Sequence, residues 1–256
     1  TGDLCHYGGC GAAPHPAALV FEPHRAARPD VPLRRPFAAA VNRDVVVRVV
    51  LQGDAAPAAP LLPSWLTGYP ASVVATDSTP VGRSVIAGLP ADRRTLVLRV
   101  TAGDPVARAI AERVAVDGRE AGFLMTDQAP TGLAPRADVR LIRVLLSVTS
   151  PERSLAALMG SLGARTLVTV TREPAPQPGV PVEAVARVER ALLEPFVIVP
   201  VVHLPILAAA GERVEIFAGS MMQPIGRWNF ADVWLQPSPR PSASSPDNKP
   251  DEAARR

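Results

Sequence analysis

The sequence predicts an α/β fold in which helices cover a mixed sheet, and three stretches carry this prediction. Residues 95–126 show a strand, a helix and a strand in succession, residues 138–162 show a strand followed by a helix, and residues 182–202 show a helix followed by a strand. Apolar residues three or four positions apart indicate the helices, and β-branched or alternating runs indicate the strands. Strands and helices in this order are typical of an α/β lobe with a mixed sheet.

The first stretch is a β-α-β unit. Its strands are expected at Thr95–Val100 and Phe123–Thr126, on either side of a helix at Pro105–Ala121. Asp104 suits the N-cap of this helix, the proline after it suits the first helical position, and Gly122 suits the end. Because the helix supplies the crossover, the two strands are expected to run parallel.

The later elements follow from the same signals. Ser150 is the expected N-cap of a helix that ends near Gly163, and a further helix is expected at Val182–Leu193. Strand-prone runs occur at Ala17–Glu22, Asp138–Ser147, Thr166–Val170, Phe196–Val202 and Arg213–Ala218.

The stretch Val31–Pro63 is predicted to form one helix with a proline-rich exit. Its apolar residues follow helical spacing, and Asp30 suits the N-cap. Gly53 is a natural end, after which the Ala-Pro pairs prevent the helix from continuing. Pro36 is expected to remove one hydrogen bond inside this helix.

Two apolar features concern packing rather than chemistry. The connection Leu61–Leu89 is rich in Pro and Gly, and Trp65 and Tyr69 are expected to anchor it on the core. The longest apolar run, Phe196–Ala210, is interrupted by two prolines and a histidine and is shorter than the ~20 residues that a membrane span needs. We therefore interpret it as a buried strand with irregular ends.

Composition narrows the function classes. The chain has 256 residues, a hydrophobic fraction of 47% and a formal charge of +3, which suits one large domain or two small ones with a real core. Its arginines are scattered and few aromatic residues lie among them. Nucleic-acid binding needs a basic stripe or a stacking platform, so no nucleic-acid partner is expected.

Candidate chemical motifs are sparse. Cys5, His6 and Cys10 do not complete a zinc site, although the two cysteines would suit a local disulfide in an oxidising compartment. The sequence contains no Gly-x-Ser-x-Gly elbow, no His-Glu-x-x-His motif and no phosphate loop. The prediction is therefore a protein that is not an enzyme and that has no metal and no cofactor.

Five segments in collinear order carry a family resemblance. They are the helix containing Ala40-Val41-Asn42-Arg43-Asp44 with its Pro-rich exit, Thr95–Phe123, Ala137–Leu158, Glu189–Pro205 and Gly226–Leu235. Together they resemble the family 5 extracytoplasmic solute-binding proteins of ABC importers, the dipeptide-, oligopeptide- and nickel-binding type. The likeness runs from Leu19 to Leu235 and covers only the second half of a typical member. Pro36 and Gly118 depart from the family pattern, which usually lacks the proline and has a leucine at the second position.

The resemblance implies a periplasmic-binding-protein type II-like lobe with a mixed sheet, in an incomplete two-lobe architecture that lacks most of the first lobe. In the family, the ligand lies between two lobes that close like a hinge. The expected division is an irregular N-terminal segment at 1–16, the α/β second lobe at 17–200, a segment returning toward the first lobe at 201–236, and a disordered tail at 237–256.

The resemblance also suggests where a ligand would bind. In the family, the segment after the third strand crosses the cleft and often supplies a Trp and an Asp, and the Asp can pair with the amino terminus of a peptide. This chain has neither there. The candidate ligand-binding residues are Val144, Leu145, Leu146, Ser147, Val148, Thr149 and Ser150. Their character points to an apolar or unusual ligand or to lost binding, and the segment equally fits a plain strand end and helix cap.

Four further residues are candidates for hinge or interlobe contacts: His203, Trp228, Asp232 and Trp234. The two tryptophans are an even number of positions apart and would share one face of a strand. Core packing is the simpler role for them, as it is for His203.

The function that the resemblance implies is solute capture, with a small solute of the peptide type, for an ABC importer. Its partners would be the permease subunits in the membrane, and its location extracytoplasmic, although the chain carries no signal peptide. The alternative is an orphan lobe that acts as a protein-interaction or scaffold module. Its exposed interlobe face would then invite a partner or self-association.

Overall fold

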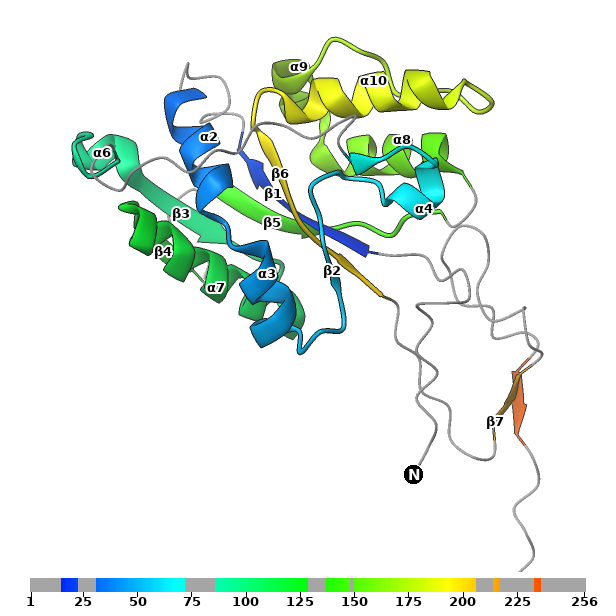
Figure 1. The fold of residues 1–256 in the computed structure, drawn as a ribbon, viewed down its shortest axis with the longest axis horizontal. Coiled ribbons are helices and arrows are strands. Elements are labelled where there is room, and N and C mark those ends of the chain that lie inside the picture. Colours follow the sequence, from blue (N-terminus) through cyan, green and yellow to red (C-terminus); the bar gives the residue numbers. More distant parts are fainter. Residues whose placement is uncertain are drawn as a thin grey trace, which may run out of the picture.

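A six-stranded mixed sheet forms the centre of the protein (Figure 1). The computed structural model describes residues 15–22, 31–71, 86–128, 137–147, 150–205, 214–216 and 233–235. In the order β2-β6-β1-β5-β3-β4, the sheet contains β1 (His15–Phe21), β2 (Ala56–Pro57), β3 (Thr95–Arg99), β4 (Leu124–Gln128), β5 (Val139–Arg143) and β6 (Ile198–Leu204). Two short strands, β7 (Val214–Ile216) and β8 (Val233–Leu235), pair antiparallel with each other.

The strand directions confirm the predicted mixed sheet. β3 runs parallel to both β4 and β5, as expected for the β-α-β unit. β1 runs antiparallel to β5 and to β6, and β2 runs antiparallel to β6. In β1 all residues from Ala17 to Phe21 are buried, and in β6 every residue except His203 is buried. These two central strands are therefore covered on both faces.

The helices form two groups in Figure 1. One group contacts the β3-β4-β5 half of the sheet through α7 and comprises α2 (Val31–Ala40), α3 (Arg43–Val45), the π-helix η1 (Val46–Val50) and α7 (Pro105–Ala121). The other group contacts β6 through α10 and comprises α8 (Pro151–Leu162), α9 (Ala164–Val170) and α10 (Val182–Leu193). The short helices α4 (Ser64–Thr67) and α6 (Ala91–Arg94) lie in the connections.

Phe37 fixes α2 on the sheet. Its ring is fully buried and makes edge-to-face contacts with Phe21 of β1 and with Phe123 just before β4, at centroid distances of 5.5 and 5.6 Å. Edge-to-face pairs at this distance stabilise a core beyond the area that they bury. In a chain so poor in aromatic residues, these three rings join α2, β1 and β4.

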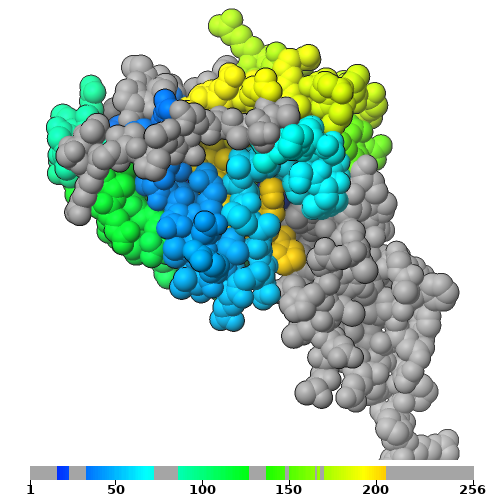
Figure 2. Space-filling model, in the orientation of Figure 1, coloured from blue at the N-terminus to red at the C-terminus, as the bar shows by residue number. Residues whose placement is uncertain are grey.

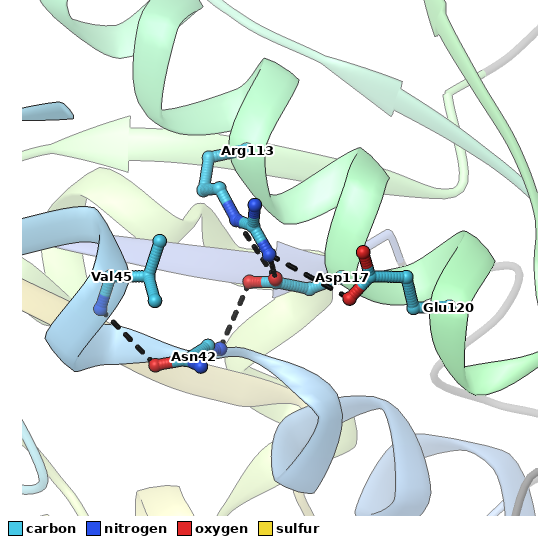
Figure 3. Close-up of polar contacts among 5 residues, drawn as sticks. All are labelled: Asn42, Val45, Arg113, Asp117 and Glu120. Atoms are coloured by element: carbon cyan, nitrogen blue, oxygen red, sulfur yellow. Dashed lines mark hydrogen bonds and ion pairs between the residues drawn. The ribbon is translucent and has the colours of Figure 1, made fainter. Parts of the chain in front are cut away.

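The single helix predicted from Val31 onward is wrong, because the chain breaks at Val41 and Asn42 (Figure 3). Asn42 leaves the helical conformation, and its side-chain oxygen accepts the N–H of Val45 at 3.1 Å. Its own N–H donates to Asp117 of α7 at 2.9 Å. Asn42 therefore begins a second helix, which explains the break. Gly53, at φ +91°, lies just beyond the end of this helical stretch, as predicted, and Pro36 lies inside α2.

Arg43 ties the same break to β6. Its Nε donates to the carbonyl oxygens of Ala58 and Pro200, both at 2.9 Å, and burial lowers the pKa of the guanidinium. Pro200 lies in a central strand, at the point where the register between β1 and β6 shifts. A bulge of this kind tolerates a residue that has no N–H to donate.

Three further expectations are corrected. The β-prone run Thr166–Val170 is part of helix α9, because Thr166 and Val170 both reach the core at helical spacing and tertiary packing overrides the local preference. β1 already includes His15 and Pro16, which were expected in the irregular N-terminal segment. β6 begins two residues later than predicted, since Phe196 has a φ of +53°, and it continues through residue 204 without a break at the expected domain boundary.

Asp117 offers a test of the helix break. Its carboxylate is almost fully buried and binds both Asn42 N–H and the Arg113 guanidinium, whose Nε lies 2.9 Å away. The Asp117→Ala variant would leave Asn42 N–H without its acceptor and should lower the free energy of unfolding by about 2 kcal/mol. Urea unfolding measures this loss.

The matched control is Glu120→Ala. Glu120 is exposed and lies 3.7 Å from the same guanidinium. Removal of an exposed partner should cost less than about 0.5 kcal/mol. Equal losses in the two variants would show that Asp117 acts only as a general charge partner of Arg113 and does not support the break at Asn42.

Candidate functional site

The topology of the sheet places a switch point between β3 and β5. From β3 the chain passes through α7 to β4 on one side, whereas from β5 it passes through α8 toward β6 on the other side. β3 and β5 are parallel neighbours, with Leu98 opposite Val139 and Arg99 opposite Arg140. Ligands of open α/β sheets bind outside the carboxyl ends of strands at such a point. We call the residues that follow these two strands, 100–104, 144–147 and 150, the carboxyl edge.

An ion pair joins the two sides of the carboxyl edge. Arg143 at the end of β5 donates from Nη1 to both carboxylate oxygens of Asp104, at 2.9 and 2.8 Å. Asp104 also accepts the N–H of Ala107 at 2.9 Å, as the predicted N-cap of α7. Both charged side chains remain about a quarter exposed. The sequence gives no signal for this pair, because the two residues meet only through the register of β3 and β5.

A shallow pocket of about 270 Å³ lies over the first turns of α7. It is lined by Gly103, Asp104, Pro105, Arg108, Ala109 and Glu112. Its wall therefore combines carboxylates and a guanidinium with small residues, next to the ion pair. An arrangement of this kind can hold polar groups of either charge at the carboxyl edge.

The predicted ligand-binding segment has a mixed environment. Val144 and Leu146 are buried in the core, and Val144 N–H donates to the carbonyl oxygen of Pro16 at 3.2 Å. Leu145 and Ser147 are half-buried. Ser150 is buried, and its Oγ accepts the N–H of Arg153 at 3.2 Å, as the predicted cap of α8. Two of the candidate residues, Val148 and Thr149, lie outside the described part of the chain.

The strand expected at Asp138–Ser147 ends four residues early, at Arg143. Beyond Val144 the backbone turns away from the sheet, because Ser147 N–H donates to the side chain of Ser154 in α8 instead of a neighbouring strand. Nothing in the sequence alone marks Ser154 as a partner of this segment. Leu145 and Ser147 are consequently the candidate residues, among those described, that retain accessible side-chain surface.

Two of the four hinge candidates, His203 and Trp234, lie in the described part of the chain. His203 lies in β6, opposite Ala56 of β2 and Pro16 of β1, and its Nε2 is 3.2 Å from the carbonyl oxygen of Leu61. Burial lowers the pKa of its imidazole. Trp234 lies in β8 opposite Glu215. Trp228 and Asp232 are outside the described residues, as are Cys5 and Cys10, so a hinge role stays a prediction for all four candidates.

A second polar cluster is buried against α10. Glu189 has an exposed fraction of 0%, yet its Oε1 accepts the N–H groups of Leu61 and Leu62 at 2.6 and 2.9 Å, and its Oε2 accepts the hydroxyl of Tyr69. We call these four residues the Glu189 latch. Burial raises the pKa of Glu189 although the three donors oppose this shift, and burial together with the carboxylate raises the pKa of Tyr69. Strongly shifted groups are candidates for function, but both carboxylate oxygens here are engaged by the segment that they hold.

The latch explains the outcome for the two predicted anchors. Tyr69 is buried against α10, as expected. Trp65 is 54% exposed, so its predicted role as an anchor is wrong. α4 is a single turn that buries Thr67 and leaves Trp65 exposed. Figure 2 shows α4 at the surface beside α10.

None of the helices in the described part of the chain combines the length and apolar character that a membrane span requires.

Comparison with known proteins shows the fold. No family model and no curated protein matches the chain. The oligopeptide-binding protein AppA from Bacillus subtilis, solved in complex with a nonapeptide, matches with a TM-score of 0.67 and 14% identity over 88% of this chain and 51% of its own. NikA from Brucella suis in complex with Fe(III)-EDTA gives a TM-score of 0.64 and 14% identity over 88% and 51%. A dipeptide-binding protein from Pseudoalteromonas sp. SM9913 in complex with Met-Leu matches with a TM-score of 0.58 and 15% identity, over 88% of this chain and 49% of its own.

The chain spans about half the length of the solved structures that it matches. These structures are binding proteins, and others like them are described as ABC transporter substrate-binding proteins. The protein thus has the α/β fold of about half of a substrate-binding protein of this type. The resemblance predicted from the sequence is confirmed at the level of the fold.

The Glu189 latch predicts a pH dependence of stability. A carboxyl whose pKa is raised in the fold stabilises the fold while it is protonated, and this contribution is lost as pH rises from about 4.3, the ordinary value, through the raised pKa. The unfolding free energy of the wild type should therefore fall relative to that of Glu189→Gln as pH rises above about 4.3. Urea unfolding of both proteins at pH values around and above about 4.3 measures the difference between their unfolding free energies. Because both proteins contain His203, its titration largely cancels from that difference.

Glu183→Gln changes an exposed glutamate of the same helix and serves as the control. The pH dependence that belongs to the buried carboxyl is the change that Glu189→Gln shows beyond that of Glu183→Gln. A wild-type advantage over Glu189→Gln that grows with pH would contradict the prediction and would show that the three donors stabilise the ionised carboxylate more than burial penalises it.

Proposed function

We propose that this chain contributes to a solute-binding receptor of an ABC importer and that its carboxyl edge contacts a peptide. The observation that carries this proposal is the switch point between β3 and β5. The fold that contains it matches about half of each of two proteins that were solved with a peptide bound. In a two-lobed receptor, the opposite wall of the cleft would come from the half of the similar structures that this chain does not match. The location would then be extracytoplasmic, and the partners would include the permease subunits in the membrane.

The side chains at the carboxyl edge favour a peptide with apolar side chains. Leu145 offers accessible apolar surface, and the segment from Val144 to Ser150 contains no acid that could pair with an amino terminus. The ion pair of Arg143 and Asp104 lies directly before this segment. Its two charges could bind the ends or the backbone of a peptide only if the pair rearranges, so the apolar contact is the stronger basis for recognition.

One observation favours a second candidate, a protein-interaction module. Ser147 N–H and Ser150 Oγ, which could otherwise face a ligand, are both hydrogen-bonded within the chain. A surface with few free polar groups suits a protein partner as well as a solute. The two candidates differ in a measurable way, since a receptor binds a small solute and a scaffold binds protein or itself.

Ligand-dependent melting of the purified chain tests the proposal. The probes are pooled di- to hexapeptides, the dipeptide Met-Leu, nickel chelates and sugars. A ligand present at a hundred times its dissociation constant stabilises a fold by about 2.7 kcal/mol, which corresponds to several degrees. A rise with apolar peptides supports the proposal. A cooperative melt that no probe moves contradicts solute capture by this chain and favours the interaction module.

Leu145→Ala tests the contact itself. Loss of the apolar side chain at the carboxyl edge should weaken the binding of the active peptide pool about tenfold, or about 1.4 kcal/mol, as measured by calorimetry. The control is Leu124→Ala, because Leu124 is also a partly exposed leucine but begins β4 and so lies at the opposite, amino edge of the parallel strands. Equal affinity in the two variants would mean that Leu145 is not in the site.

A further inference from the structure

Ser154 is the polar side chain that closes the end of the carboxyl edge. It lies in the second turn of α8 and has an exposed fraction of 0%. Its Oγ accepts the N–H of Ser147 at 2.9 Å. The same oxygen lies 2.9 Å from the carbonyl oxygen of Ser150 and 3.1 Å from that of Ser147, and its one hydroxyl hydrogen can be donated to either.

The two ends of residues 144–147 are bonded to different elements. Val144 still bonds to β1 through Pro16, whereas the next described backbone bond of the segment is the one from Ser147 to Ser154. Leu146, fully buried, fixes the chain between these two bonds. The position of Leu145 is therefore set by β1 on one side and by Ser154 on the other.

The usual role of a serine inside a helix does not account for this arrangement. Helical serines often bond back to the carbonyl four residues earlier, as Ser154 does toward Ser150. Ser154 also receives an N–H from seven residues earlier, outside the helix, and the cap of α8 is already supplied by Ser150. A buried hydroxyl among apolar neighbours such as Leu155 is costly unless it is bonded, so its contribution lies in the bond to the segment.

We propose that Ser154 is a positioning residue for ligand recognition: it holds residues 144–147 in the conformation that presents Leu145 to an apolar group of a peptide. The identity of the ligand in this inference rests on the proposed function. The conformation rests on the geometry of Ser147, Ser150 and Ser154. Ser154 would thus control the affinity of the site although it is buried and touches no ligand itself.

Hydrogen exchange of the full chain tests the conformation without any ligand. Ser154→Ala should accelerate exchange of the Ser147 amide at least tenfold, because the amide loses its acceptor, while amides in α10 keep their protection. The matched control is Ser161→Ala, since Ser161 lies in the same helix but its Oγ bonds only to Leu158 within that helix, at 2.6 Å. Unchanged exchange at Ser147, or equal acceleration in both variants, overturns the proposal.

Binding tests the consequence. Ser154→Ala should weaken binding of the active di- to hexapeptide pool about tenfold at a temperature well below the melting transition, and Ser161→Ala should leave it unchanged. If the wild type binds no pool, the proposed function fails, whereas the exchange experiment still decides the conformational role. Faster exchange with unchanged peptide affinity would reduce Ser154 to a structural residue and overturn its role in recognition.

Ser154→Cys covers the case in which the alanine variant does not fold. A thiol fills the space of the hydroxyl, being somewhat larger, but is a weak acceptor. Exchange at Ser147 and peptide affinity should then change in the same direction as in Ser154→Ala and by a smaller factor. Wild-type values for both measurements in a folded Ser154→Cys protein overturn the proposal.

Discussion

The buried carboxylate of Glu189 is the interaction on which the arrangement of one half of the molecule depends. It binds two successive backbone amides and one phenol of an otherwise irregular segment, and Leu61 in turn contacts His203 through its carbonyl oxygen. α10, the segment 61–69 and β6 are thereby joined through a few polar atoms. A proline-rich connection has little regular hydrogen bonding of its own, so it takes its conformation from the residue that receives its donors.

The carboxyl edge is organised by bonds between loop and helix rather than by a single buried charge. Asp104 caps α7 and pairs with Arg143, and Ser150 caps α8 while Ser154 bonds to Ser147. In each case a helix start is bonded to the end of β5 or to the segment that follows it. The edge of the sheet where a ligand would lie is thus defined by contacts that also begin the helices.

Local rules predicted the elements that carry their own caps. α7 and α8 have the predicted bounds because their capping residues, prolines and glycines act within one turn of the chain. α10 has no side-chain cap, and its predicted bounds rest on apolar spacing after Pro181. The break at Asn42 was missed because one of the two bonds that support it comes from Asp117, which lies 75 residues away. The Glu189 latch and the pair of Arg143 and Asp104 are likewise long-range. The segment predicted to bind a ligand follows β5 at the carboxyl edge, and only the fold shows which of its side chains are accessible, whereas its role in binding stays a prediction.

One of the five segments that carry the family resemblance has a structural task. Asn42 caps a helix and bonds to α7, and Arg43 bridges two carbonyl oxygens, one of them in β6. The Asn42 oxygen and the Arg43 guanidinium are thus both engaged within the fold. A requirement for folding alone would be enough to retain these residues. The Ala-Val-Asn-Arg stretch is therefore explained by the fold, and any ligand specificity has to be inferred from other positions.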